Sequence, residues 1–400
     1  MKNKVLILNF FNVTYRDRPL WLFGFYTFRM VISLYFFTFF QTNALQAQNL
    51  FAGYEKFFQE PRTYVVAKTS EHLTIDGRAD ETSWNDAPWS DDFVDIEGDN
   101  KPLPHFNTRM KMLWNDSCLF IFTEMEEPHV WAYFDKRDQI VYHENDFEVF
   151  LDPDGDTHNY FEFEVNALNT LFDLFLTRPY QDGGVPLISW NAQDFISAVS
   201  INGTLNDPGD TDKNWTIEIA IPFRCLSLGL KDNTPVNGQI WKVNFSRVQW
   251  KTTVSDGKYR KVTDEKTAKP LREDNWVWSP TGEINLHVPE RWGLLQFADR
   301  PINQELPAFS IPEEENLKKY LWLIYYKQEA QKINQGKYAL TLSEIGMPDN
   351  VLTIEGEKIV LAMKATTAQF TAYLKTKAGK IFSVNNQGFI TEMKEVNSHE

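Results

Sequence analysis

Residues 145–166 read NDFEVFLDPDGDTHNYFEFEVN, and this stretch decides the fold. Apolar and acidic residues alternate on both sides of the central DPDGD, which is built from turn-forming residues. Alternation with a period of two is typical of half-buried β-strands. The stretch therefore predicts a β-hairpin with one apolar face turned to a core and one acidic face turned away from it.

The acidic face of this hairpin carries four carboxylates, because residues two apart on a strand share a face. They are Asp146, Glu148, Glu162 and Glu164. Like charges on adjoining strands repel, so we expect an offset: a bound cation, Arg or Lys from a neighbouring strand, or staggered strands with water between them. A metal, sugar hydroxyls, glycosidic chemistry and plain solvation all remain open as explanations of this face.

The turn itself has a pattern related to calcium sites. Asp152, Asp154 and Asp156 resemble the start of a loop in which alternate oxygens wrap a hard cation. The EF-hand pattern is not matched, because Gly155 stands at the fourth position rather than the sixth. A structural Ca²⁺ on these three aspartates and a plain turn are the two hypotheses.

Enzymatic motifs other than paired carboxylates are not found in the sequence. Retaining glycosidases need carboxyl groups roughly 5 Å apart and inverting ones roughly 6.5–9.5 Å, and neighbours on a sheet face can meet either requirement. No nucleophile elbow, zinc-binding helix motif or phosphate loop is present. No catalytic residue is therefore assigned, and a glycoside hydrolase using the hairpin acids is kept as an alternative.

Composition narrows the class of protein. A chain of 400 residues with 24% charged residues fits about two globular domains, and its net charge of −15 argues against nucleic-acid binding. Aromatic residues reach 15%, and 11 of the 13 Trp lie between Trp84 and Trp292. The two cysteines, Cys118 and Cys225, lie in apolar runs without a Cys-x-x-Cys motif, so we expect buried free thiols.

The N-terminus has the pattern of an export signal. Arg29 ends a positively charged flank, Met30–Phe40 is an apolar segment, and Ala44 and Ala47 supply small residues for cleavage. We predict a signal peptide over residues 1–47 and a mature chain in the periplasm, on the cell surface or outside the cell. An uncleaved anchor is the alternative.

Residues 64–297 read as short β-strands separated by turn residues, which predicts a mainly β fold, an antiparallel β-sandwich. Two polar stretches, 202–214 and 252–275, read as surface loops. The strand-like stretches are HLTIDG (72–77), TRMKMLWND (108–116), CLFIFTEM (118–125), DFEVFLD (146–152), YFEFEVNALN (160–169), WTIEIAIPF (215–223) and IWKVNFSRVQW (240–250).

A second, smaller unit follows a linker over residues 298–315 that is rich in Pro and Glu. Residues 317–333 have apolar residues at helical spacing, and three short strand patterns follow them. We predict that residues 316–400 form a small α+β module, a helix plus an antiparallel sheet. It carries no titratable cluster, so it is expected to pack or to dock a partner, such as an envelope protein or a hydrolase.

Several segments in order resemble the carbohydrate-binding module family 9-like domain. They include HLTIDGRADETSWNDAPW (72–89), NDFEVFLDPDGD (145–156), NWTIEIAIPF (214–223) and VPERWGLLQF (288–297). The resemblance spans about residues 64–297. It implies a β-sandwich that binds sugars in secreted glycan-degrading systems, often as an accessory to a hydrolase, with structural Ca²⁺ in some members.

The resemblance also implies site residues. In sugar-binding members an aromatic residue just before the acidic strand stacks on the sugar ring, and Tyr142 stands at that place. The position of a second aromatic falls near Leu286, which is not aromatic. Trp276 and Trp278 lie a few residues earlier and are the expected substitutes, with Trp278 favoured. The predicted carbohydrate-binding set is Tyr142, Glu148, Asn166, Trp190, Arg247 and Trp278. Arg247 is expected to point away from the side of Val243 and Phe245, toward the ligand or the hairpin acids.

These observations leave three hypotheses. The first is a secreted, non-catalytic carbohydrate-binding protein that serves polysaccharide or glycan catabolism. The second is the glycoside hydrolase. The third is a cell-envelope structural or interaction protein whose sandwich has lost sugar binding.

Overall fold

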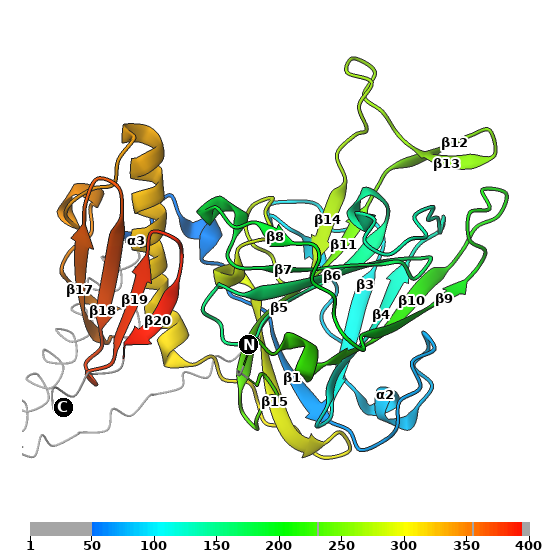
Figure 1. Ribbon diagram of the computed structural model, residues 1–400, viewed down its shortest axis with the longest axis horizontal. Helices are drawn as coiled ribbons and strands as arrows, with labels where there is room; N and C mark the ends of the chain where they lie inside the picture. Colours follow the sequence, from blue (N-terminus) through cyan, green and yellow to red (C-terminus); the bar gives the residue numbers. More distant parts are fainter. Residues whose placement is uncertain (1–49, 230–231, 354–355, 394–400) are drawn as a thin grey trace, which may run out of the picture.

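The computed structural model describes residues 50–229, 232–353 and 356–393. They form a β-sandwich and a smaller module beside it (Figure 1). The predicted signal peptide lies outside these residues. Within them, no helix combines the length and the apolar character needed to cross a bilayer.

The predicted β-sandwich is confirmed. Its described strands form one continuous 13-stranded sheet that folds over its own core. The order is β8-β7-β6-β5-β11-β15-β1-β3-β4-β10-β9, with β14 beside β11 and β2 beside β14. Most pairs are antiparallel, but β1 pairs in parallel with β15 and β3. The bounds are β1 Thr63–Lys68, β2 Val94–Asp95, β3 Thr108–Trp114, β4 Cys118–Glu126, β5 Asp146–Asp152, β6 Tyr160–Asn166, β7 Leu171–Leu176, β8 Pro186–Leu187, β9 Ile196–Asn202, β10 Asn214–Pro222, β11 Ile240–Gln249, β14 Asp274–Val277 and β15 Gly293–Pro301.

The predicted hairpin is β5 and β6, and its apolar face is in the core. Val149 pairs with Phe163 across the hairpin, and both side chains are fully buried. They join one hydrophobic cluster with Ile121 of β4 and Ile219 of β10 from the opposite layer. Contacts between the two layers thus explain why the alternating stretch is stable as a hairpin.

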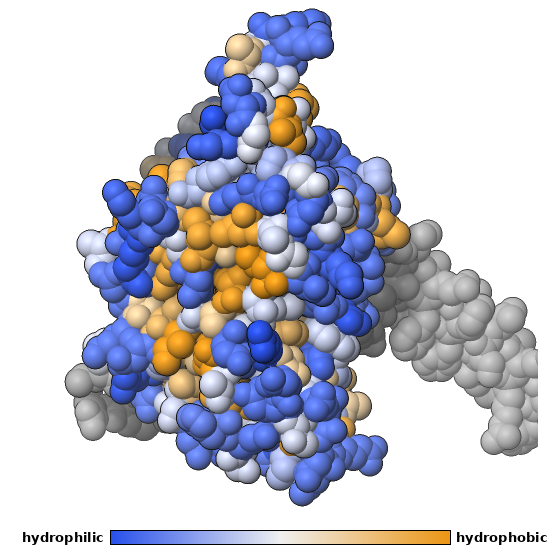
Figure 2. All heavy atoms as spheres, turned by 90° about the vertical axis from the view of Figure 1, so that its right-hand side faces the viewer, coloured by the Kyte–Doolittle hydropathy of each residue, from blue (hydrophilic) through white to orange (hydrophobic). Residues whose placement is uncertain are grey.

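Short helices occupy several connections of the sandwich, and one more, η1 Glu55–Phe57, precedes β1. Those in the connections are α2 Thr82–Asp86, η2 Val141–His143, η3 Tyr180–Asp182, η4 Phe223–Leu226 and η5 Pro289–Arg291. Cys225 is buried, Cys118 is partly buried and both are free thiols. Figure 2 turns the side that carries β9 to the viewer and shows apolar residues gathered at its centre within a hydrophilic surround.

Two sequence predictions about the sandwich are wrong. HLTIDG is not a strand, because the backbone N–H groups of Asp76 and Gly77 donate to the carboxylate of Glu218 (3.0 and 3.3 Å) instead of joining a ladder. Residues 252–275 are not only a loop. They contain a projecting hairpin, β12 Thr252–Ser255 and β13 Lys258–Lys261 (Figure 1).

The module consists of helix α3 Glu313–Gln335, η6 Ser343–Ile345 and a five-stranded antiparallel sheet. Its strands are β16 Asn350–Leu352, β17 Lys358–Ala365, β18 Phe370–Lys375, β19 Ile381–Asn385 and β20 Ile390–Met393. This confirms the predicted helix-plus-sheet fold. The connection from the sandwich is shorter than predicted, because β15 continues to Pro301 and α3 begins at Glu313.

Helix α3 is apolar all round over residues 320–326 (YLWLIYY), because it is covered on two sides. The sheet of the module packs on one side, through β18 and β19. Residues 50–58 pack on another: the rings of Phe51 and Tyr320 lie 5.2 Å apart, and those of Phe57 and Tyr326 lie 4.9 Å apart. The first described residues therefore belong to the core of the C-terminal module.

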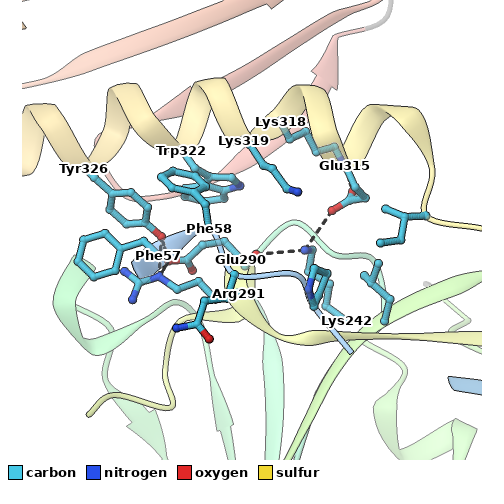
Figure 3. Close-up of a pocket in the computed structure, with 14 residues that line it drawn as sticks. Phe57, Phe58, Lys242, Glu290, Arg291, Glu315, Lys318, Lys319, Trp322 and Tyr326 are labelled. Carbon is cyan, nitrogen blue, oxygen red and sulfur yellow. Dashed lines mark hydrogen bonds and ion pairs between the residues drawn. The ribbon is translucent and has the colours of Figure 1, made fainter. Parts of the chain in front are cut away.

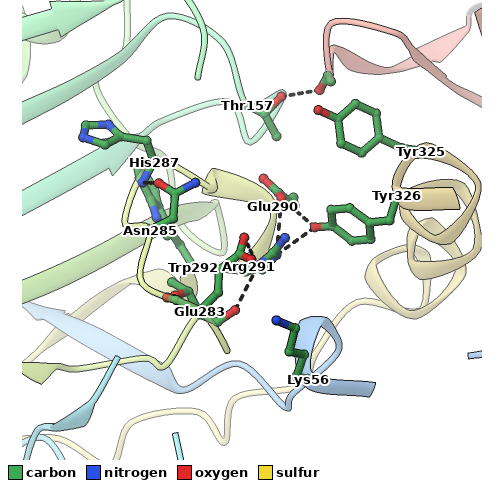
Figure 4. A network of polar contacts seen from close by, with 12 residues as sticks. Lys56, Thr157, Glu283, Asn285, His287, Glu290, Arg291, Trp292, Tyr325 and Tyr326 are labelled. Atoms are coloured by element: carbon green, nitrogen blue, oxygen red, sulfur yellow. Dashed lines mark hydrogen bonds and ion pairs between the residues drawn. The ribbon is translucent and has the colours of Figure 1, made fainter. Parts of the chain in front are cut away.

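A buried polar network joins the module to the sandwich (Figure 4). Arg291 donates from Nε to the Tyr326 hydroxyl (2.8 Å) and from Nη1 to Glu283 (2.8 Å). The Tyr326 hydroxyl donates to Glu290 (2.6 Å). The guanidinium also lies 4.0 Å from the ring centre of Phe57. Every polar group at the centre of this contact therefore has a partner.

A second contact joins Lys242 of β11 to Glu315 of α3 at 3.0 Å (Figure 3). Burial alone would raise the pKa of Glu315, but the charges of Lys242 and Lys318 outweigh it and lower the pKa to about 2. A cavity between the two units at this contact measures about 50 Å³. The module is thus closely docked on the sandwich.

The third contact uses the DPDGD turn. The Thr157 hydroxyl donates to the carbonyl of Gly388 (2.5 Å), and the backbone N–H of Ile390 donates to the carbonyl of Asp156 (3.3 Å). His158 Nε2 lies 2.8 Å from the carbonyl of Gln387. The turn between β5 and β6 is therefore a docking point for the β19–β20 turn.

Tyr326→Phe should lower the free energy of unfolding by about 1–3 kcal/mol, because it leaves Arg291 and Glu290 buried with one partner fewer. Chemical denaturation followed by tryptophan fluorescence measures the change. Tyr373→Phe, on a partly exposed tyrosine of β18, is the control and should change little. Equal stability of the two variants would show that the network does not stabilise the docked state.

Candidate functional site

A cleft of about 490 Å³ opens on the acidic face of the hairpin, within the size range of small-molecule sites. Its floor comes from β5, β6 and β7. Its walls come from residues 140–142, 180–188, 272–275 and 284–287. The lining residues that carry the argument are Tyr142, Glu148, Glu162, Glu164, Tyr180 and His287.

The floor of the cleft is a cluster of buried carboxylates. Glu148 pairs directly with Glu164 across the hairpin, and Glu162 lies one pair further along the same face. Burial raises the pKa of Glu148 to about 7. Burial, followed by the charges of the neighbouring carboxylates, raises the pKa values of Asp146, Glu162 and Glu164 well above their usual range.

Few partners offset these charges. The backbone N–H of Tyr142 donates to Glu164 (3.1 Å). Both oxygens of Asp146 and one oxygen each of Glu148 and Glu162 lack a hydrogen bond of normal geometry in the described structure. The backbone of Val248 and the hydroxyl of Ser246 act to lower the pKa values of Asp146 and Glu148, but burial outweighs both. Arg272 is the single basic side chain among the described residues that line the cleft, and it is exposed. The floor therefore presents buried carboxyl oxygens that the protein itself leaves largely without hydrogen bonds.

The rim of the cleft presents rings and aliphatic side chains. Tyr142 is 39% exposed and Tyr180 is 43% exposed. The ring of Tyr180 meets His287 edge to face, with 4.4 Å between ring centres. His287 Nδ1 lies 2.9 Å from the Tyr160 hydroxyl, and loss of hydration lowers the pKa of His287 to about 3, so the ring is neutral at physiological pH.

The structure places two residues of the predicted sugar-binding set in this cleft, Tyr142 and Glu148. Leu286 and the acidic-face residues Glu162 and Glu164 line it as well. Asn166 is not among its lining residues. Asn166 is fully buried, and its side-chain oxygen accepts hydrogen bonds from the backbone of Leu168 and Thr170 (3.0 Å each). Its role is to hold the turn between β6 and β7.

The expectation that Trp278 stacks on a sugar is wrong. Its side chain is 1% exposed and packs in the core, with its ring centre 5.8 Å from that of Phe245. A Cβ atom at Gly293 would come within 2.3 Å of the Trp278 ring, so the glycine makes room for it. Trp190 is partly buried and packs on Phe161 of the core face, on the other side of the hairpin from the acids.

The expected direction of Arg247 is also wrong. It lies on the same face of β11 as Val243 and Phe245, since residues two apart share a face, and it is 1% exposed. It forms an ion pair with buried Glu127 (3.2 Å) and donates to Gln249 (2.7 Å). Arg247 therefore does not neutralise the hairpin acids.

The sequence interpretation missed Tyr180 and His287. Both residues come from connecting segments, where binding residues are common. The one sequence signal for Tyr180 is its place between Pro179 and the glycines of a turn. Glu162 and Glu164 belonged to the acidic face but not to the predicted sugar-binding set.

The three aspartates of the DPDGD turn place carboxylate oxygens within 4.8 Å of one another. Asp152 already accepts hydrogen bonds from the backbone N–H groups of Gly155 (3.0 Å) and Thr157 (2.9 Å). Asp156 accepts one from His158 (2.9 Å). These bonds account for the shape of the turn, and calcium at this turn stays a prediction.

The profile of a family described as carbohydrate family 9 binding domain-like matches residues 75–299, more than half of the chain. The chain belongs to this family. The cleft of this carbohydrate-binding domain-like protein lies entirely within the matched residues. No curated protein matches the chain.

Solved structures similar to this family 9-like protein include a carbohydrate-binding module family 9 from Caldicellulosiruptor kristjanssonii. Its complex with cellotriose has 17% identity and a TM-score of 0.37 and covers 62% of this chain and 100% of its own. Its glucose complex has 16% identity, the same coverage and a TM-score of 0.36. A putative carbohydrate-binding protein from Bacteroides uniformis ATCC 8492 has 17% identity, covers 60% of this chain and 100% of its own, and has a TM-score of 0.42.

In a chelating buffer, the stability of this family 9-like protein should fall as pH rises from about 4.5 to about 7. The unfolded chain releases the Glu148 proton near pH 4.5, while the folded chain keeps it until about pH 7. This shift corresponds to on the order of 3 kcal/mol. Thermal unfolding midpoints across this range should fall less in Glu148→Gln than in the native sequence, and an identical slope would contradict the assignment.

Proposed function

We propose that this protein is an exported, non-catalytic glycan-binding protein that serves polysaccharide or glycan catabolism and holds its ligand in the cleft. The observation that carries the proposal is the combination of exposed tyrosine rings with buried carboxylate acceptors in one cavity. The family to which the chain belongs supports a carbohydrate as the ligand. The export signal read from residues 1–47 supports the location.

The chemistry of the cleft suits a sugar. The C–H faces of a sugar ring are apolar and pack on flat aromatic rings, which Tyr142 and Tyr180 provide. Sugar hydroxyls donate hydrogen bonds, and the unpartnered oxygens of Glu148 and Glu162 accept them. Because the floor is acidic and only Arg272 adds a positive charge, the cleft favours a neutral glycan over an anionic one.

Binding to a glycan array by the purified full chain tests this proposal. Tyr142→Ala and Tyr180→Ala should each weaken binding to the glycans held by the native sequence by roughly ten-fold, because each removes an apolar stacking surface. Tyr373→Ala in the module is the matched control and should bind normally. If both cleft variants bind as tightly as the control, the glycan site lies elsewhere.

A glycoside hydrolase is the second candidate, and one observation favours it. Glu148 has a pKa of about 7 and lies opposite Glu164, a pairing that suits an acid and a carboxylate partner. Glu148→Gln and Glu164→Gln would then each reduce turnover by at least a hundred-fold. Release of reducing ends from a broad glycan panel measures this, and a folded protein without turnover on any glycan removes the candidate.

A further inference from the structure

We propose that Asp146, Glu148 and Glu164 bind a hard divalent cation, Ca²⁺ in first place, between Asp146 and the floor of the cleft. The three side chains come from neighbouring positions on one face: Asp146 and Glu148 are two apart on β5, and Glu164 pairs with Glu148. This site is separate from the three aspartates of the DPDGD turn.

The spacing of the oxygens fits one ion. Each of the three carboxylates offers an oxygen that lies within 4.8 Å of the other two. Ca²⁺ binds its oxygen ligands at about 2.3–2.6 Å, so two ligands of the same ion lie at most roughly 5 Å apart. The three carboxylates are therefore already close enough to share one cation.

The state of Asp146 points to a ligand independently of this spacing. Its side chain is 0% exposed, and neither of its oxygens accepts a hydrogen bond of normal geometry in the described structure. The backbone of Val248 approaches closely enough to lower the pKa of Asp146, but burial outweighs this effect. Buried carboxylates are normally hydrogen-bonded or paired, since leaving one bare is costly. Glu148 shares this condition through its unpartnered Oε2 atom.

The protein's own cations do not meet this need. Arg247 lies in the part of β11 that pairs with β5 beside Asp146 and Glu148. Its guanidinium nevertheless lies on the opposite face of the sheet, where it pairs with Glu127. Arg272 lines the cleft but is exposed and forms no ion pair with the three acids among the described contacts. A bound cation remains as the partner for the cluster.

The donor set selects the kind of ion. All three ligands are carboxylates, and no His or Cys belongs to the cluster. The hydroxyl of Ser246, on the strand position paired with Glu148, is buried and lies close enough to act on the pKa of Glu148, so it adds one more oxygen beside the cluster. Oxygen donors of this kind suit Ca²⁺ or Mg²⁺ rather than zinc or copper, and Ca²⁺ tolerates the irregular geometry better.

We further infer that the cation contacts the glycan bound in the cleft, and this inference rests on the proposed function. Glu148 and Glu164 belong both to the cluster and to the cleft lining, whereas Asp146 lies beneath them. Three carboxylates do not complete the six to eight ligands of Ca²⁺. The remaining positions face the cleft, where water or a pair of sugar hydroxyls would fill them.

Calorimetric titration of the chelator-treated full chain with CaCl₂, without glycan, tests the site. The native sequence should bind a cation, and Asp146→Asn should weaken this binding at least ten-fold. Asp154→Asn, which alters the DPDGD turn, is the matched control and should keep the site. An absence of binding by the folded native chain, or unchanged binding by Asp146→Asn, would overturn the proposal, as would loss only in Asp154→Asn.

Thermal unfolding shows whether a loss of cation binding in Asp146→Asn comes from the site or from a folding defect. In chelator, Asp146→Asn should unfold at least as high as the native sequence, because it removes one of the crowded charges. Added CaCl₂ should raise the midpoint of the native sequence and of Asp154→Asn but not of Asp146→Asn. A calcium-induced rise of equal size in Asp146→Asn would contradict the site.

Glycan binding with and without chelator tests the second step separately. Loss of binding in chelator, restored by CaCl₂, would support contact between the cation and the sugar. Unchanged glycan binding in chelator would overturn that contact while the titration still supports the cation site. A blank array together with a positive titration would overturn the proposed function and leave the cation site standing.

Discussion

The register of β5 between β6 and β11 is the constraint on which the rest of the structure depends. Val149 is opposite Phe163 on one side and Phe245 on the other, and all three are fully buried. A shift by one residue would place Glu148 in the core and expose the apolar set, so burial of these side chains fixes the register. Once it is fixed, Glu148 must lie opposite Glu164.

The crowding of carboxylates is thus a consequence of core packing. Neutral side chains at the same positions would avoid the repulsion. Burial, followed by the charges of the neighbouring acids, raises the pKa values of Glu162 and Glu164. Residues that reduce stability in this way are commonly kept for binding or catalysis. The cleft above them, with its two exposed tyrosines, is the place where we propose that these acids contact a ligand.

Local pattern was enough to predict much of the fold. The hairpin of β5 and β6, the sandwich and the helix-plus-sheet module follow from alternation, turn residues and helical spacing. The prediction of a strand at HLTIDG was wrong because the carboxylate of Glu218, distant in the chain, accepts hydrogen bonds from the backbone N–H groups of Asp76 and Gly77. No local pattern contains that information.

The site was predictable only near the hairpin. Tyr142 and Glu148 lie in or beside the acidic strand, and the structure places both in the cleft. The prediction for Trp278 was wrong because an aromatic residue just after a strand gives the same sequence pattern whether it packs in the core or faces a ligand. The burial of Arg247 depends on Glu127, which lies 120 positions earlier in the chain. Tyr180 reaches the cleft through a connection whose path depends on the whole sheet.

The β5–β6 hairpin has two structural roles. Its strands form the floor of the cleft, and its turn contacts the module through Thr157 and Asp156. Among relatives of this chain, the length and sequence of that turn are therefore restricted from both sides. The tip of the β12–β13 hairpin, Asp256 and Gly257, is exposed and carries no such double duty. Insertions and substitutions should accumulate at the tip of the β12–β13 hairpin and be rare in the turn between β5 and β6, although both turns contain an Asp-Gly pair.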